Sequence, residues 1–274
     1  MKFSVLIASY NNGRYLEECL DSILNQDYAD IEIIVVDDCS QDHSMTLLEQ
    51  FATNFPNIKV LRNEQNRGAG YTKKRCIDAS SGELCGFVDP DDKLALHAVS
   101  LMVQKHRELE NASLIYSTNY ECDEQMNIVQ ISSWVKEQPV DVSVIQETYV
   151  GHFATFKREL YSQSIQMEPT FKRAVDHDLY CALEGVGPIV FVDEPLYYYR
   201  QHEGGISLKK NRYKAEFWDW IVKYRHASLR GVNLEEDYAK LMSNRIDAPG
   251  RAGRLLSNVY TVYLWCRKKV DKWI

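Results

Sequence analysis

Three carboxylates lie within four positions at Asp89, Asp91 and Asp92, directly after the apolar run Leu84 to Val88. Carboxylates this close repel one another, and a hard cation such as Mg²⁺ or Mn²⁺ commonly keeps them ionised. The same residues also suit an Asp-rich surface turn with Pro90 at its second position. The residues alone leave both interpretations open.

A second acidic pair, Asp37 and Asp38, ends the apolar run Ile31 to Val36. A carboxylate at such a strand end can accept hydrogen bonds from a nucleotide base or ribose. It can also cap a helix N-terminus, although Ser40 or Asp42 would serve equally well. This pair is therefore a candidate nucleotide contact with a structural alternative.

Several nucleotide-handling and phosphorylation classes are disfavoured by the residues after the first apolar run, Phe3 to Ala8. A receiver-type phosphorylation domain carries aspartates there, whereas this chain has Ser9 and Tyr10. Gly13 alone cannot form a G-x-G-x-x-G motif, and residues 68–70 have the wrong spacing for a P-loop. Dinucleotide oxidoreductases and P-loop kinases are thereby disfavoured.

The elements that position these residues alternate along the first half of the chain. Buried strands are predicted at 3–8, 31–36, 58–61 and 84–88, and helices at 16–24, 45–52 and after residue 70. This alternation predicts an α/β layer with a mostly parallel sheet, in which ligands bind outside the carboxyl ends of the strands. From residue 113 shorter strands such as 114–120 and 128–132 follow, and from residue 209 the pattern is mostly helical.

The composition indicates a globular protein that works in a reducing compartment. The 274 residues are 45% hydrophobic and 26% charged, which is enough for a sizeable core, and the net charge of −7 disfavours nucleic acid as a partner. Seven cysteines, an odd number with no C-x-x-C pair, argue against a disulfide framework or a zinc site. No signal-peptide core or membrane-spanning stretch is visible, which predicts a cytoplasmic location.

The C-terminus differs in charge, because its last 24 residues hold six Lys and Arg against one Asp. At helical spacing an apolar stripe forms from Leu255, Val259, Val262, Tyr263, Cys266, Val270 and Trp273, while Arg254, Lys268 and Lys272 lie opposite. Such a helix can pack on the rest of the protein or lie on anionic lipids at the inner membrane face. Both interpretations stay open.

Taken together, the motifs resemble family-2 inverting glycosyltransferases of the GT-A fold. The resemblance rests on residues 4–11, the helix with Leu20 to Gln26, residues 32–42, 63–68, 82–83 and 89–92, in that order. It implies an α/β GT-A fold, with a Rossmann-like sheet, helices on both faces and a helical C-terminal extension. The implied boundaries are 1–208 for the catalytic domain, divided into a nucleotide-sugar half 1–112 and an acceptor half 113–208, and 209–274 for the extension.

The resemblance also implies roles for residues in the first half. The implied nucleotide contacts are Ala8, Tyr10, Asp38, Asn66, Lys73, Asp89 and Asp91, with Asp38 at the base and Asp89 at the ribose or the metal. Asp91 and Asp92 match the family's D-x-D element, which binds Mn²⁺ or Mg²⁺. One departure is that Lys73 and Lys74 stand where the family usually has Arg-Asn, so a bidentate contact is lost.

In the second half, residues 174–180 are similar to the family's acceptor motif, usually Glu-Asp-x-Asp-Leu. Asp176 matches its catalytic base, which takes the proton of the acceptor hydroxyl, and Asp178 is the alternative base. Val175 stands where a Glu is usual. Both aspartates could instead complement the dipole of a helix N-terminus.

Residues 199–207 are similar to the family's Tyr-Arg-x-His segment. The resemblance implies that His202 completes the metal shell or contacts the diphosphate, with Arg200 near the donor. A histidine in a loop can equally be structural.

The sequence therefore predicts a metal-dependent inverting transferase that moves a sugar from a UDP-linked donor to a saccharide or lipid-linked saccharide, in polysaccharide or glycoconjugate synthesis. The alternative is an inactive nucleotide-binding or interaction protein with the same fold, although such a protein would not need a base at Asp176. A nucleotidyltransferase is disfavoured because residues 10–15 do not form a Gly-rich basic loop.

Overall fold

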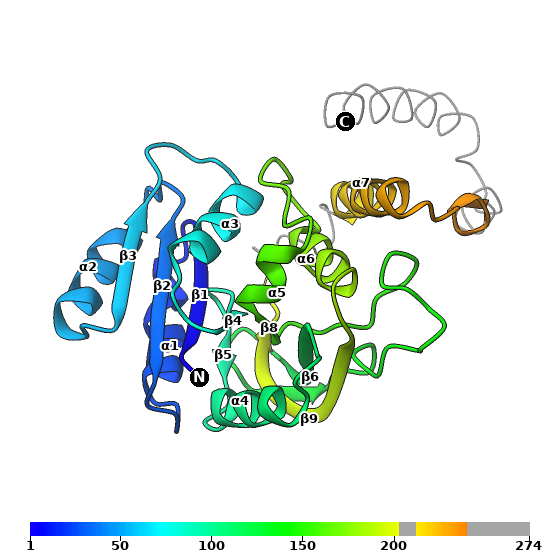
Figure 1. The fold of residues 1–274 in the computed structure, drawn as a ribbon. Helices are drawn as coiled ribbons and strands as arrows, with labels where there is room; N and C mark the ends of the chain where they lie inside the picture. Colours follow the sequence, from blue (N-terminus) through cyan, green and yellow to red (C-terminus); the bar gives the residue numbers. More distant parts are fainter. Residues whose placement is uncertain (203–211, 240–274) are drawn as a thin grey trace.

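The computed structural model describes residues 1–202 and 212–239 (Figure 1). Nine strands in this part form one sheet, in the order β3-β2-β1-β4-β8-β6-β9-β5, with β7 paired to β6. The strands are β1 (Phe3–Ser9), β2 (Ile31–Asp37), β3 (Ile58–Arg62), β4 (Leu84–Phe87), β5 (Lys93–Leu94), β6 (Leu114–Cys122), β7 (Ile128–Ile131), β8 (Ala154–Lys157) and β9 (Ile189–Arg200).

The helices follow the strands in the alternation that the first half of the sequence predicts. They are α1 (Gly13–Leu24), α2 (Ser44–Asn54), α3 (Ala69–Ala79), α4 (Ala98–Glu108), α5 (Arg158–Gln163), α6 (Val175–Glu184) and α7 (Arg212–Arg230). The prediction of an α/β layer is thus confirmed.

The sheet is parallel in its first half and mixed in its second. β1 pairs in parallel with β2 and β4, and β2 with β3. β8 then lies antiparallel between β4 and β6, whereas β9 returns parallel to β6. The mostly parallel sheet expected from the first half therefore ends at β4, and the second half adds antiparallel strands beside it.

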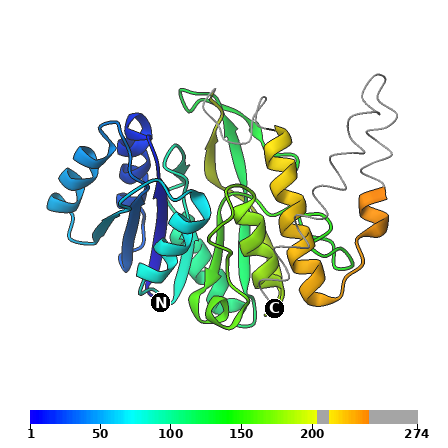
Figure 2. The same ribbon diagram turned by 90° about the horizontal axis from the view of Figure 1, so that it is seen from above.

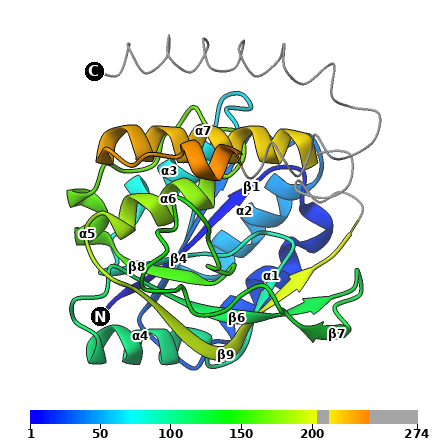
Figure 3. The ribbon, with the colours of Figure 1, turned by 90° about the vertical axis from the view of Figure 1, so that its right-hand side faces the viewer.

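Two hydrophobic cores cover the two faces of the sheet, because side chains alternate along each strand. Phe3, Val5 and Ile7 of β1 pack in one core with residues of α1, α2 and α4. Leu6 points to the other core, which is shared with α3, α5, α6 and α7. Figure 3 shows α4 below the sheet and α6 and α7 above it.

Helix α7 lies beside α6 and covers its outer side (Figures 1 and 2). Its presence agrees with the helical pattern predicted from residue 209, but the amphipathic basic helix predicted after Pro249 lies outside the described residues. The domain boundaries likewise stay predictions.

Within residues 1–202 and 212–239, no helix is both long and apolar enough to span a membrane. A cytoplasmic location and contact with the inner membrane face stay predictions from the sequence.

Candidate active site

The carboxylate of Asp38, at the end of β2, shapes the loop that precedes α3. It accepts hydrogen bonds from the side-chain amide of Asn63 at 2.7 Å and from the backbone amides of Arg67 and Gly68 at 2.8 Å each. Asp38 is 3% exposed. The carboxylate thus lies at the strand end where a nucleotide contact was expected, and its hydrogen bonds hold the loop 63–68 in place.

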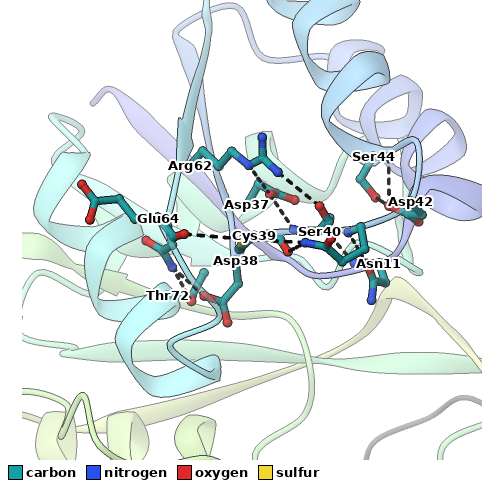
Figure 4. A network of polar contacts seen from close by, with 12 residues as sticks. Asn11, Asp37, Asp38, Cys39, Ser40, Asp42, Ser44, Arg62, Glu64 and Thr72 are labelled. Atoms are coloured by element: carbon teal, nitrogen blue, oxygen red, sulfur yellow. Dashed lines mark hydrogen bonds and ion pairs between the residues drawn. The ribbon is translucent and has the colours of Figure 1, made fainter.

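The loops after β1 and β2 are linked directly to each other (Figure 4). The backbone amide of Asn11 donates to Oγ of Ser40 at 2.9 Å, and Oδ1 of Asn11 accepts from the amide of Gln41 at 2.8 Å. Oδ2 of the buried Asp37 accepts from the amide of Ser40 at 2.9 Å. Asn11 and Cys39 both adopt left-handed backbone angles, with φ of 55° and 64°. The two strand ends therefore form one structured rim.

The remaining residues expected at the nucleotide lie on or near this rim. Ala8 is half-buried near the end of β1, and Tyr10, directly after β1, is 45% exposed. Asn66 is exposed in the loop that Asp38 organises. These residues leave side-chain surface available along the carboxyl ends of β1 and β2.

Asp92 is the most enclosed member of the acidic cluster after β4. Its Oδ2 accepts a hydrogen bond from the hydroxyl of Tyr197 and its Oδ1 one from the backbone amide of Arg200, both at 2.7 Å. Asp92 is 1% exposed, and burial together with the Asp91 and Asp89 carboxylates raises its pKa well above the usual value. This environment argues against the expected metal ligation by Asp92, because both of its oxygens already accept hydrogen bonds from β9.

Asp91 has a different environment, since its carboxylate contacts the ring of His202. Oδ2 of Asp91 lies 2.8 Å from Nε2 of His202. Burial and the nearby Asp89 carboxylate raise the pKa of Asp91 above its usual value, against the opposing effect of His202. The pair offers an oxygen and a nitrogen donor at one point, although no group of three or more metal-ligating side chains is assembled among the described residues.

Arg200 is a buried residue that contacts the backbone of the acidic cluster. Its guanidinium donates to the carbonyl oxygens of Asp91 at 2.7 Å and Glu124 at 2.6 Å, and it pairs with the Glu18 carboxylate at 2.5 Å. The side chain is 3% exposed. Because its donors are engaged within the protein, this geometry argues against the expected contact between Arg200 and a donor diphosphate, and it assigns Arg200 to holding the Asp91 backbone.

Lys73 of α3 joins the two halves of the site. Its ammonium lies 2.6 Å from Oδ1 of Asp176 and 3.3 Å from Oδ1 of Asp89. Burial opposes the ionisation of Asp89, but the Lys73 charge lowers its pKa below the usual value. These three residues line a small pocket together with Phe87, His152, Ala154, Leu179 and Tyr180. The predicted contact residue Lys73 thus lies between a strand-end carboxylate and the predicted base.

The two candidate bases on α6 have opposite environments. The side chain of Asp176 is 47% exposed and lines the pocket. The side chain of Asp178 is fully buried and accepts hydrogen bonds from the backbone amide of Glu168 at 2.6 Å and from Arg225 and His226 of α7 at 2.7 Å each. The structure therefore argues against Asp178 as a base.

Helix α7 is fastened to the helix that carries Asp176 by a second polar contact. Nδ1 of His177 lies 2.7 Å from Oδ1 of Asp219, and Nε2 of His177 lies 2.6 Å from the carbonyl oxygen of Val144. With the Asp178 contacts, the bond between His177 and Asp219 holds α6 against α7. Helix α7 thus helps to hold the helix whose first turn carries Asp176.

His152, which precedes β8, is a pocket residue that the sequence did not reveal. Its ring stacks on Tyr199 with centroids 4.1 Å apart and lies 5.8 Å from the ring of Tyr197. Burial lowers the pKa of His152, while the Asp89 and Asp176 carboxylates oppose that shift. A single histidine between Gly151 and Phe153 has no motif around it, so only the fold associates it with these carboxylates.

Known proteins are similar to this chain in sequence and in fold. The sequence model of glycosyl transferase family 2 matches residues 4–165. Chondroitin synthase of Escherichia coli is 26% identical over 244 residues, which are 84% of this chain and 35% of that protein. The chain therefore spans about a third of the length of this relative.

Two solved structures are similar in fold. S. aureus TarS residues 1–349, in complex with UDP-GlcNAc, has a TM-score of 0.66 at 24% identity and covers 81% of this chain and 66% of its own. The mannosyltransferase PcManGT of Pyrobaculum calidifontis, in complex with GDP-Man and Mn²⁺, has a TM-score of 0.57 at 16% identity and covers 98% and 86%. The expected GT-A fold is confirmed.

The match to the family model covers more than half of the 274 residues and includes the strand ends that carry Asp38, Asp89 and Asp91. The resemblance that the motifs indicated is thereby confirmed. This chain belongs to glycosyl transferase family 2.

Proposed function

We propose that this chain transfers a sugar from a UDP-linked donor to a saccharide or lipid-linked saccharide, with inversion at the anomeric carbon and with a divalent metal. The observation that carries the proposal is the Asp176 carboxylate. It is half exposed in the pocket that Asp89 also lines, and Lys73 bridges the two side chains. A carboxylate so arranged has the access that a general base needs.

In the proposed reaction Asp176 accepts the proton of the acceptor hydroxyl as that oxygen forms a bond to the anomeric carbon. The bond from that carbon to the diphosphate oxygen breaks on the opposite side, and UDP leaves with its bonding electron pair. Lys73 holds one oxygen of Asp176 in a fixed direction, since its ammonium is only 2.6 Å away. Such positioning contributes to catalysis by fixing the geometry of attack.

Asp91 and His202 would hold the Mn²⁺ or Mg²⁺. The Asp91 carboxylate oxygen and the His202 imidazole nitrogen lie 2.8 Å apart, and both are donor types that bind divalent cations. When bound, the metal would neutralise charge on the departing diphosphate. The Mn²⁺ in the PcManGT complex supports this part of the proposal.

The donor nucleotide would lie along the rim formed by the ends of β1 and β2. Ala8, Tyr10 and Asn66 offer contacts there, and Asp89 lies near the ribose. Asp38, whose buried carboxylate oxygens already accept hydrogen bonds from the loop 63–68, would act by holding that loop beside the base. The UDP-GlcNAc complex of TarS supports a UDP-linked donor. The competing function, an inactive nucleotide-binding protein, would retain this rim without needing Asp176.

The test is the substitution Asp176→Asn in the full chain, with UDP-sugars screened in the presence of Mn²⁺. We expect UDP-sugar affinity, measured by calorimetry, to change little, while the rate of UDP release falls by roughly 10²- to 10⁴-fold, the usual loss for a general base. Asp21→Asn, an exposed acid on α1, is the matched control. Unchanged turnover in Asp176→Asn, or a collapse of donor affinity, would contradict the proposal.

A further inference from the structure

A second cavity, of about 430 Å³, lies between the segment that leads into α6 and the N-terminal part of α7. Its lining residues are basic or aromatic: Lys172, Arg173, Tyr213, Lys214, Phe217 and Trp218. Nothing in the proposed donor site uses these residues. The cavity is therefore separate from the proposed donor site, and it lies between the end of the predicted acceptor half and α7.

The charge of this cavity is positive although the whole chain is acidic. Three of its six lining residues are cations, and Lys172 and Lys214 are both exposed. In the described part of the chain, neither lysine lies within ion-pair distance of a carboxylate. Exposed lysines gathered at one cavity favour an anionic ligand.

Aromatic rings form the rest of the cavity wall. Trp218 lies 5.6 Å from the ring of Phe171 and 5.5 Å, edge to face, from the ring of Phe217. Tyr213 is 61% exposed beside them. Aromatic faces accept the C–H faces of sugar rings, so the wall suits a saccharide that carries anionic groups.

A short stretch of backbone connects the cavity to the proposed reaction centre. Arg173 precedes Asp176 by three residues, a span of at most about 11 Å of chain. Between them Ala174, at the start of α6, has a left-handed φ of 53°. On the other side, a Cβ at Gly68 would lie 4.0 Å from Cγ of Lys172, so the cavity also neighbours the loop that Asp38 organises.

We propose that this cavity binds the acceptor, and that the acceptor is a polyanionic saccharide with carboxylate or phosphate groups along its chain. The proposal rests on the transferase function proposed above and extends it to the class of acceptor. The cations bind the acidic groups, the aromatic wall supports the sugar rings, and the chain end reaches Asp176.

The experiment measures binding of three probes of similar length to the full chain: a galacturonate hexamer, a glycerol phosphate hexamer and the neutral maltohexaose. We expect at least one anionic probe to bind more tightly than maltohexaose, and its affinity to fall with added salt. The tighter of the two anionic probes identifies carboxylate or phosphate as the recognised group.

The variant is the double substitution Lys172→Ser and Lys214→Ser, and the charge-matched control is Lys105→Ser with Arg107→Ser on α4, across the sheet from α7 (Figure 3). We expect the anionic probe to lose about 10- to 100-fold in affinity in the cavity variant only. Equal affinity for all three probes, or equal losses in both double variants, would overturn the proposal. Thermal melting shows whether each variant is folded.

A separate measurement keeps the two proposals distinguishable. If UDP-sugars neither bind nor are turned over by the wild-type chain, the transferase proposal fails, whatever the cavity binds. If UDP-sugars are turned over, but all three probes bind equally well or both double variants lose equal affinity, only the acceptor proposal fails.

Discussion

The ammonium of Lys73 lies within 3.3 Å of both Asp89 and Asp176, two carboxylates that are far apart in the sequence. Burial alone would lower the pKa of Lys73, but the two carboxylates outweigh burial and raise it. Lys73 therefore stays charged throughout the working pH range and connects the end of β4 to the first turn of α6.

Replacing Lys73 with Met should lower turnover more than donor affinity. Asp176 loses its partner, and a misplacement of about 1 Å can cost roughly 10²-fold in rate. Steady-state kinetics should show a reduced kcat with a smaller change in donor KM. Lys73→Arg retains the charge and should recover part of the lost turnover. Equal turnover in Lys73→Met and in the wild type would contradict a positioning role.

Lys73→Met should also change the dependence of kcat/KM on pH. Lys73 lowers the pKa of Asp89, so the Asp89 proton is bound only at low pH in the wild type. Without Lys73 the pKa of Asp89 rises, and the acid limb of the kcat/KM profile should move to higher pH. An acid limb at the same pH in both proteins would show that Asp89 ionisation does not control activity.

Asp178→Ala should destabilise the fold strongly. The change leaves Arg225 and the fully buried His226 without their carboxylate, and breaking a buried pair costs about 3–5 kcal/mol. Urea unfolding measures the difference. Asp176→Ala is the control: it should cost much less, because Asp89 still neutralises Lys73 and the Asp176 side chain is half exposed.

Gly70→Ala should separate α3 from the segment that leads to α6. A Cβ at Gly70 would lie 2.4 Å from the carbonyl oxygen of Phe171, and the Gly70 amide donates to that same oxygen at 3.0 Å. Overpacking of this kind costs about 1–3 kcal/mol. The melting temperature and turnover should both fall. Gly185→Ala is the control, because the atom nearest to its added Cβ belongs to the flexible end of the Arg230 side chain. An equal fall in melting temperature in that variant would argue against a clash with backbone as the cause.

Glu32 should contribute stability that depends on pH. Burial opposes its ionisation, but hydrogen bonds from Lys2, Ser4 and Ser81 lower the pKa of Glu32 to about 2. A depressed carboxyl pKa stabilises the fold above the unfolded pKa of about 4.3, and that stability is lost as pH falls toward 2. Glu32→Gln should therefore cost about 1–3 kcal/mol at pH 7, and the difference should shrink below about pH 4. Urea unfolding at several pH values measures it, and a difference that is independent of pH would contradict the assignment.

The sequence by itself determined the order of the strands and helices in the first half and the residues at the strand ends. Apolar runs that end in polar residues are local signals, so the pattern alone assigns Asp38, Asp89 and Asp91 to one edge of a sheet. The structural alternative for Asp176 and Asp178, that both begin a helix, is confirmed, because both lie in the first turn of α6.

Only the tertiary structure decided which member is more open to a ligand in two acidic pairs, Asp176 with Asp178 and Asp91 with Asp92. Asp176 and Asp178 are two positions apart on α6, a rotation of about 200°, so one side chain faces the pocket while the other faces α7. Asp91 and Asp92 differ in the same way, because the long strand β9 supplies partners to Asp92. The Lys73 bridge and the stacked ring of His152 depend on contacts between segments distant in the chain, and no local pattern in the sequence records such contacts.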